Sequence, residues 1–289
     1  MHRSNAIQQH LAQLHQLLAS QSSEYASLTV KEATDKYLAE RPLKEHTKKM
    51  YTMCFEATFG RLSAADISAV KLVEVTREQI MAGFRSASGK QVANLAICLL
   101  RGTFNHLELT PPLRRFPRNQ MRPRDRVIPR ELLPRLWQAV AKMNPMTTLA
   151  LVFLLGFGLR RSEVANLMWT DFTATQFTVR ATKNGKDLTL PITPKLRVAL
   201  PESRGLLVCP KSLKKHAVHK LRNELEFAWS AHDCRRTFAT TAVELGISSY
   251  LIKALLNHAT GDITFEHYVR PSMAAKLQAL ETIQQVLLP

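Results

Sequence analysis

The chain is 289 residues long, which is enough for two domains of ordinary size. Its apolar content of 45% supports hydrophobic cores and excludes a disordered tail or a fibre. Lysine and arginine number 40 against 23 acidic residues, which gives a net charge of +17. This excess indicates a polyanionic partner, with nucleic acid favoured over a membrane, since the longest apolar run, Leu149–Leu159, is too short to span a bilayer.

The N-terminus and the cysteines predict a cytoplasmic protein. The first twenty residues, MHRSNAIQQHLAQLHQLLAS, contain no continuous apolar signal region and no cleavage signature. The four cysteines lie far apart and form no CxxC pair, so we expect free thiols and no structural zinc. These cysteines are Cys54, Cys98, Cys209 and Cys234.

Helical patterns fill the first part of the chain. Residues 1–26 are expected to form an N-terminal extension with one short amphipathic helix. Residues 27–108 predict a compact all-α domain of four helices joined by short connections. Two of these helices begin with capping-box pairs, Thr29 with Glu32 and Thr76 with Gln79.

Residues 109–128 interrupt this helical pattern. The segment reads LTPPLRRFPRNQMRPRDRVI, and its prolines forbid a continuous helix. It therefore predicts an extended linker between two domains. The segment is rich in arginine and holds a single acid, Asp125, which favours contact with phosphate over a merely solvated linker.

Residues 129–289 are expected to form a second domain, mainly helical with a small antiparallel sheet. The run MTTLALVFLLGFG is typical of a helix that is buried on all sides. Apolar residues then alternate on both sides of Asn184-Gly185, which predicts a β-hairpin with a type I′ turn. Helices return from about Lys214, and the last, in SMAAKLQALETIQQVLLP, carries apolar residues along one side.

Six residues of this second half could carry chemistry, although each has an ordinary structural explanation when taken alone. An arginine at a helix end often caps carbonyl groups, and a lysine in a turn is usually solvated. A histidine at a helix end usually makes structural hydrogen bonds, and a lone tyrosine is more often a packing residue than a nucleophile. The six are Arg160, Lys183, His232, Arg235, His258 and Tyr268.

Together, the six residues match the requirements of phosphoryl transfer. This reaction needs positive donors on the non-bridging oxygens, an acid for the leaving oxygen, a base and a nucleophile. Arginine suits the first task because its planar fork matches two phosphate oxygens and stays charged. The acidic residues are scattered, without a DxD or HxH cluster, so we expect no metal and no other cofactor. The sequence thus favours a metal-free transfer through a tyrosine.

The order of these motifs resembles that of the tyrosine recombinase (phage integrase) family. The matching stretches are GLRRSEVANLMW, TKNGK, HDCRRTFAT, LLNH and ITFEHY. The resemblance covers the whole second domain and, more loosely, the first. It implies a mainly α fold, with an N-terminal SAM-like core-binding domain of four helices. The C-terminal domain would be the mixed α/β catalytic domain of this family, and the family type would be the one without a separate arm-binding domain.

The resemblance implies a catalytic role for each matching residue. Arg160 and Arg235 would hold the scissile phosphate, and Lys183 would protonate the departing 5′ oxygen. Tyr268 would attack the phosphorus and form a 3′-phosphotyrosine. The 5′-hydroxyl of a second strand would later attack this intermediate and reverse the cleavage step. His232 would help to move the proton of the tyrosine hydroxyl.

The remaining positions of the motifs imply supporting roles. His258 would donate a hydrogen bond to the phosphate, and Glu163, one turn after Arg160, would orient the site without reacting. The chain departs from the family pattern at Asn257, where a glycine commonly precedes the second histidine. Two neighbours, Tyr250 and His267, are interpreted as a core residue and a surface residue.

The resemblance also implies the partners of the protein. They are double-stranded DNA with a specific core site and, in the synaptic complex, a homotetramer assembled from monomers that are free in solution. The C-terminal helix would be an exchange helix that docks on the next protomer, and the enzyme would be associated with the nucleoid. The candidates for DNA contact are Thr47, Lys48, Lys49, Lys90, Gln91, Arg101, Arg114, Arg115, Arg118, Arg122 and Arg124.

Two other functions stay open at this point. A type IB topoisomerase uses a similar site but relaxes DNA as a monomer, and the domain layout and the HxxR motif favour a recombinase over it. A site-specific DNA-binding protein with a silent active site would keep the fold and lack the chemistry. The presence of all five motifs argues against that reading.

Overall fold

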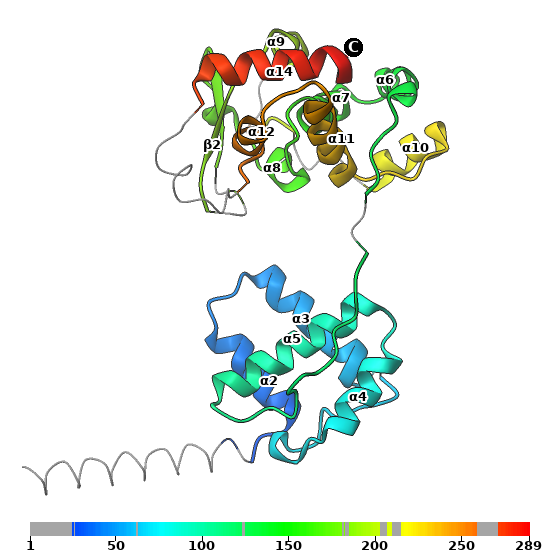
Figure 1. The fold of residues 1–289 in the computed structure, drawn as a ribbon, viewed down its shortest axis with the longest axis vertical. Helices are drawn as coiled ribbons and strands as arrows, with labels where there is room; N and C mark the ends of the chain where they lie inside the picture. Colours follow the sequence, from blue (N-terminus) through cyan, green and yellow to red (C-terminus); the bar gives the residue numbers. More distant parts are fainter. Residues whose placement is uncertain are drawn as a thin grey trace, which may run out of the picture. The chain divides into compact units, whose positions relative to one another are not determined.

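The chain folds into two compact units, residues 1–123 and 124–289 (Figure 1). The computed structural model describes residue 25 and residues 27–61, 63–122, 125–180, 182, 185–202, 207–209, 215–258 and 271–289. The predicted helix in residues 1–26 lies outside the described residues, apart from Tyr25. Within the described part the structure is mainly helical with one two-stranded antiparallel sheet, which confirms the fold class predicted from the sequence.

The described part of the first unit is built from helices. Both predicted capping boxes are present, because the side chains of Thr29 and Thr76 accept from the backbone three residues later. Phe55, Phe59 and Leu100 are fully buried where helices α3 and α5 pack together. The α-helices are α2 (Val30–Glu40), α3 (Glu45–Phe59), α4 (Arg77–Ser86) and α5 (Lys90–His106), with a short η1 (Leu72–Glu74).

The segment after α5 packs on the first unit before it leaves it. Phe116 lies edge-on to Phe84 of α4, with the ring centroids 5.3 Å apart, and Leu113 is buried in the same core. Asn94 of α5 and the backbone of Asn119 form two hydrogen bonds of 2.9 Å. The sequence predicts an extended linker from residue 109. In the structure, the apolar side chains in its first part are buried, so this part belongs to the first unit.

The second unit is built around a buried helix. Helix α7 (Pro145–Gly156) is buried throughout its second half, as its apolar sequence predicts. The short α9, which follows β2, is not predicted from the sequence. The elements are η2 (Arg130–Leu132), α6 (Leu133–Ala141), α7, α8 (Arg161–Ala165), η3 (Trp169–Asp171), β1 (Gln176–Val179), β2 (Leu188–Pro191), α9 (Pro194–Ala199), α10 (Lys215–Leu225), α11 (Ala231–Glu244), α12 (Ser249–Leu256) and α14 (Met273–Leu287).

Strands β1 and β2 form the predicted hairpin. They pair antiparallel, with Phe177 opposite Leu190 and Thr178 opposite Thr189. Phe177 is fully buried, and its ring lies 5.3 Å from that of Phe157. Gly185 has a positive φ of 73°, which glycine adopts without strain in a tight turn. Asn184, its partner in the predicted turn, lies outside the described residues.

Helix α14 packs on its own domain, against β2, α7 and α11. Its residues Leu280, Ile283 and Leu287 are buried there, and Gln284 donates to the carbonyl of Gly156 at 2.9 Å. The sequence analysis favours docking on the next protomer. The structure shows packing within one chain, and docking on the next protomer stays a prediction.

Two further observations concern the cysteines and the apolar helices. All four cysteines are free, and burial raises the pKa of the Cys209 thiol to about 12. Among the helices of the described residues, none has the length and apolar character needed to cross a bilayer.

Candidate active site

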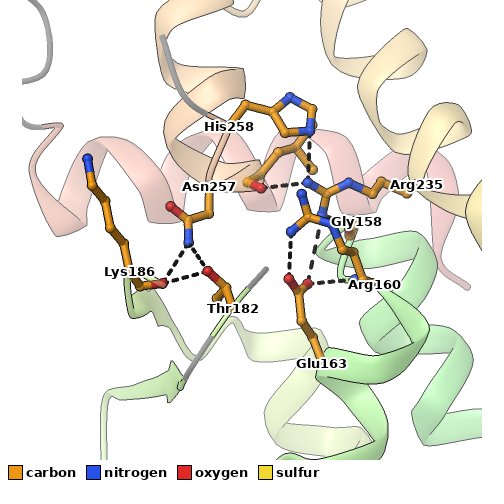
Figure 2. Close-up of polar contacts among 9 residues, drawn as sticks. Gly158, Arg160, Glu163, Thr182, Lys186, Arg235, Asn257 and His258 are labelled. Atoms are coloured by element: carbon orange, nitrogen blue, oxygen red, sulfur yellow. Dashed lines mark hydrogen bonds and ion pairs between the residues drawn. The ribbon is translucent and has the colours of Figure 1, made fainter. Parts of the chain in front are cut away.

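The site begins where α7 ends. The chain turns at Gly158, whose φ is +62°, and reaches Arg160 at the start of α8. A Cβ atom at position 158 would lie 2.7 Å from side-chain atoms of both Phe238 and Leu256. Glycine is therefore required here both for the backbone conformation and for the close approach of two other helices. The turn also points the Gly158 carbonyl at the guanidinium of Arg235 (Figure 2).

Glu163 fixes the first arginine. Its carboxylate accepts from the backbone N–H of Arg160 at 2.7 Å and from Nη1 of the same residue at 2.6 Å. The Glu163 side chain is 5% exposed, whereas that of Arg160 is 22% exposed. A buried carboxylate thus holds an arginine that is itself partly exposed (Figure 2).

Arg235 is the buried centre of the cluster. It projects from α11 and donates to the carbonyls of Gly158 at 2.7 Å and Leu256 at 2.6 Å, and to Nε2 of His258 at 2.9 Å. Its Nη1 lies 3.9 Å from Oε2 of Glu163. Burial and the charge of Arg160 lower the pKa of Arg235 to about 10, against the raising effect of Glu163. The guanidinium therefore stays charged at neutral pH.

A second buried carboxylate holds the start of α11, from which His232 and Arg235 project. Asp233 is fully buried and accepts from the N–H of Ser230 at 2.8 Å and from Arg236 at 2.9 Å. Arg126 lies 3.4 Å from the same carboxylate. The sequence analysis misses Asp233, although a Ser-x-x-Asp capping pattern ahead of α11 could have revealed it.

His258 is neutral in this arrangement. Its Nε2 accepts from Arg235, so the ring proton lies on Nδ1 and remains available to a ligand. Partial burial, then the charges of Arg235 and Arg160, lower the pKa of His258. Burial and the neighbouring Arg236 and Arg235 likewise lower the pKa of His232, which lies one helical turn before Arg235.

The lowered pKa of His258 predicts a pH dependence of stability. The unfolded chain protonates this residue near its ordinary value of 6.5, whereas the folded chain resists protonation. The stabilisation is thus present above 6.5 and is lost as the pH falls through the lowered pKa. We expect the unfolding free energy of the wild type to fall more steeply with acidification than that of His258→Gln, in a denaturant series at pH values that bracket 6.5.

The matched control for this experiment is His219→Gln, at an exposed histidine of α10. This variant should follow the wild type at every pH. Parallel curves for the wild type and His258→Gln would contradict the assignment of a neutral His258.

Because Glu163 is buried beside two arginines, removal of its negative charge should lower the stability of the second unit strongly. In Glu163→Gln the two arginines lose their shared counter-ion, and we expect the unfolding free energy to fall by about 3 kcal/mol. Tryptophan fluorescence in denaturant measures this effect on the second unit alone, because all three tryptophans lie there. Added inorganic phosphate should recover part of the loss, since an anion between the arginines replaces the missing charge.

The matched control for Glu163→Gln is Glu244→Gln. Glu244 pairs with Arg130 at 2.7 Å, but both side chains are more than half exposed, so little change is expected. An equal loss of stability in the two variants would contradict the role assigned to Glu163.

The structure brings together four residues selected from the sequence: Arg160, Glu163, Arg235 and His258 (Figure 2). Lys183 and Tyr268 lie outside the described residues, as does His267. Among the described residues, no group of three or more His, Cys, Asp or Glu side chains could hold a metal ion.

The described candidates for DNA contact lie on the first unit. Lys49, Gln91 and Arg101 are exposed, and Thr47 and Lys48 are half-buried on α3. Lys90 is exposed at the start of α5. Arg114, Arg115, Arg118 and Arg122 are exposed along the segment that follows α5, and Arg124 lies outside the described residues.

The fold is that of known DNA integrases. The chain superposes on a lambda integrase fragment, residues 75–356, solved as a dimer bound to a COC′ core site, with a TM-score of 0.68. The sequences are 16% identical, and the match covers 85% of this chain and all of that one. A Tn1549 transposon integrase bound to transposon right end DNA matches with a TM-score of 0.57 and 17% identity, over 88% of this chain and 99% of that one.

Two curated proteins of archaea are similar in sequence. The tyrosine recombinase XerA of Thermococcus kodakarensis is 26% identical over 277 residues, which cover 85% of this chain and 95% of that protein. The tyrosine recombinase XerA of Pyrococcus furiosus is 27% identical over 210 residues, or 65% of this chain and 72% of that protein. No protein-family model matches the chain. In fold, in its arginine cluster and in sequence, the chain is thus similar to the tyrosine recombinases.

Proposed function

We propose that this chain is a site-specific DNA recombinase that cleaves and rejoins strands through a 3′-phosphotyrosine intermediate. The observation that carries the proposal is the cluster of two arginines around one buried carboxylate, with a neutral histidine beside them. Such an arrangement holds fixed positive donors before any ligand arrives. A phosphodiester is the ligand that a pair of planar guanidinium groups fits best.

The described residues would act on the phosphate. Arg160 is partly exposed while Glu163 holds one of its nitrogens, so the side chain is oriented before DNA binds. Arg235 is held by two backbone carbonyls and would place its remaining donors and its charge against the same phosphate. His258 would donate from Nδ1. Together these groups would stabilise the charge that builds on the non-bridging oxygens in the transition state.

The cleavage step uses two residues outside the described part of the chain. The hydroxyl oxygen of Tyr268 attacks the phosphorus, so a P–O bond to tyrosine forms and the bond to the 5′ oxygen breaks. The tyrosine proton passes to His232 or through it to solvent, and Lys183 gives a proton to the 5′ oxygen as it leaves. The 5′-hydroxyl of a second strand then reverses these changes and releases the enzyme.

The first unit would serve as the core-binding domain, with the exposed basic residues of α3, α5 and the following segment on the DNA backbone. Lambda integrase has been solved as a tetramer bound to a Holliday junction, and that structure matches this chain with a TM-score of 0.68. We therefore extend the proposal to a homotetramer on two core sites, assembled from monomers. A DNA substrate also places the enzyme in the cytoplasm, with the nucleoid.

Strand exchange between two marked duplexes tests the proposal. We expect the protein to yield recombinant joints between two DNA molecules that carry the flanks of its own gene, without added metal. A topoisomerase of type IB would relax supercoiled DNA and yield no joints, because it acts as a monomer on one duplex. Relaxation without any joint would therefore overturn the assignment as a recombinase.

A further inference from the structure

Asn257 combines two structural roles at the end of α12. It has a left-handed backbone conformation, with φ 50° and ψ 44°, and its N–H donates to the carbonyl of Ala254. This conformation usually requires glycine, although asparagine adopts it more readily than other residues. The side chain at this position is therefore costly unless it has a use of its own.

The Asn257 side chain joins α12 to the β-hairpin. Its Nδ2 donates to Oγ1 of Thr182 at 2.8 Å and to the carbonyl of Lys186 at 2.9 Å (Figure 2). Thr182 in turn donates to the same Lys186 carbonyl at 2.6 Å and is 3% exposed. An amide nitrogen carries two hydrogens, and both are used here. The three residues form a closed network, which we call the hairpin brace.

The hairpin brace connects the two halves of the proposed site. Thr182 directly precedes Lys183, and Lys186 follows it three residues later. On the other side, Asn257 directly precedes His258, which is bonded to Arg235. One side chain thus ties the backbone that flanks the proposed general acid to the residues that hold the phosphate.

We propose that Asn257 is a positioning residue for leaving-group protonation, acting on Lys183 through the hairpin brace. The inference rests on the proposed function of Lys183. A glycine at position 257 would preserve the left-handed turn and remove only the amide. Asn257→Gly therefore removes the brace with little cost to the fold, because glycine adopts positive φ freely.

The test compares two DNA substrates. On ordinary DNA, Asn257→Gly should cleave about 10- to 100-fold more slowly than the wild type, because a misplaced acid protonates the leaving oxygen poorly. On DNA with sulfur in place of the bridging 5′ oxygen, cleavage should return to near the wild-type rate. A thiol has a pKa of about 8.5, so a thiolate leaves without protonation. A merely structural defect would slow both substrates equally.

One further single variant, a double variant and two controls test the brace. Thr182→Val should show the same loss and the same recovery with sulfur, and the double variant should be no slower than the worse single variant, because both remove one network. Thr178→Val is the matched control, since its hydroxyl pairs with that of Thr189 in the same hairpin and lies outside the brace. Glu226→Gly, at another left-handed residue after a helix, controls for the glycine itself. Both controls should cleave as the wild type does.

Lys183→Ala separates the two hypotheses. If sulfur does not restore cleavage by Lys183→Ala, the proposed function of Lys183 is wrong. If sulfur restores Lys183→Ala but not Asn257→Gly, the role of Asn257 is wrong and that of Lys183 stands. Wild-type cleavage of ordinary DNA by Asn257→Gly would also overturn the inference.

Discussion

Tyr268→Phe should abolish the covalent link between protein and DNA. The phenyl ring keeps the shape of the side chain but has no oxygen to attack the phosphorus, so we expect cleavage to slow by about 10⁴-fold or more. The measurement mixes the protein with supercoiled DNA that carries the flanks of its own gene. The reaction is quenched with SDS, and protein-linked DNA is counted.

Tyr250→Phe is the matched control for this experiment. Tyr250 is a half-buried residue of α12. The substitution removes one hydroxyl there and leaves the proposed nucleophile, Tyr268, unchanged. The control should form adducts at the wild-type rate, and Tyr268→Phe should still bind the same DNA. If Tyr268→Phe kept every DNA-dependent activity of the wild type, the chain would be a DNA-binding protein with a silent site.

Arg235→Lys should retain the charge and still lose the chemistry. A lysine ammonium cannot replace the planar fork that reaches Gly158, Leu256 and His258 together, so the charge would not be held where the phosphate binds. Loss of an arginine that stabilises phosphoryl transfer typically slows the reaction about 10³-fold or more. Two carbonyls are also left without their donor, which lowers the unfolding free energy by about 2 kcal/mol.

Single-turnover cleavage and tryptophan fluorescence in denaturant measure the two effects separately. Arg236→Lys is the matched control, because Arg236 is the next residue of α11 and its partly exposed side chain pairs with Asp233 and not with the arginine cluster. It should lose little of either quantity. In Arg235→Ala, guanidinium ions added below denaturing concentration should restore part of the cleavage rate. An Arg235→Lys variant as active as the wild type would exclude Arg235 from the phosphate site.

Local patterns predict local structure well in this chain. The capping boxes at Thr29 and Thr76 depend on side chains three residues apart, and both form as expected. The hairpin follows from alternation over a few residues, and α7 from an uninterrupted apolar run. The site residues Arg160, Glu163, Arg235 and His258 were selected by their order in the sequence, and the structure brings them together.

Interactions between distant segments could not be predicted in this way. The side of α14 that packs on α7 is apolar whether its partner lies in the same chain or in another, so its sequence does not distinguish the two. Leu113 and Phe116 stand among prolines and arginines that predict a linker, yet they fit a gap in the first core. Asn257 is a departure from a motif in the sequence, and only the fold shows its bonds to Thr182 and Lys186.

The anchoring of the linker's far end determines how the chain can be divided. Among the described residues, the first apolar core ends at Phe116 and the second begins at Ile128, and they share no side chain. The backbone of Ile128 donates to Thr237 at 2.8 Å, and Arg126 pairs with Asp233 on the same helix. A truncated protein for structural work must therefore start before Arg126. A boundary at Pro129 would leave a buried carboxylate without one of its cations, beside the arginine on which the chemistry depends.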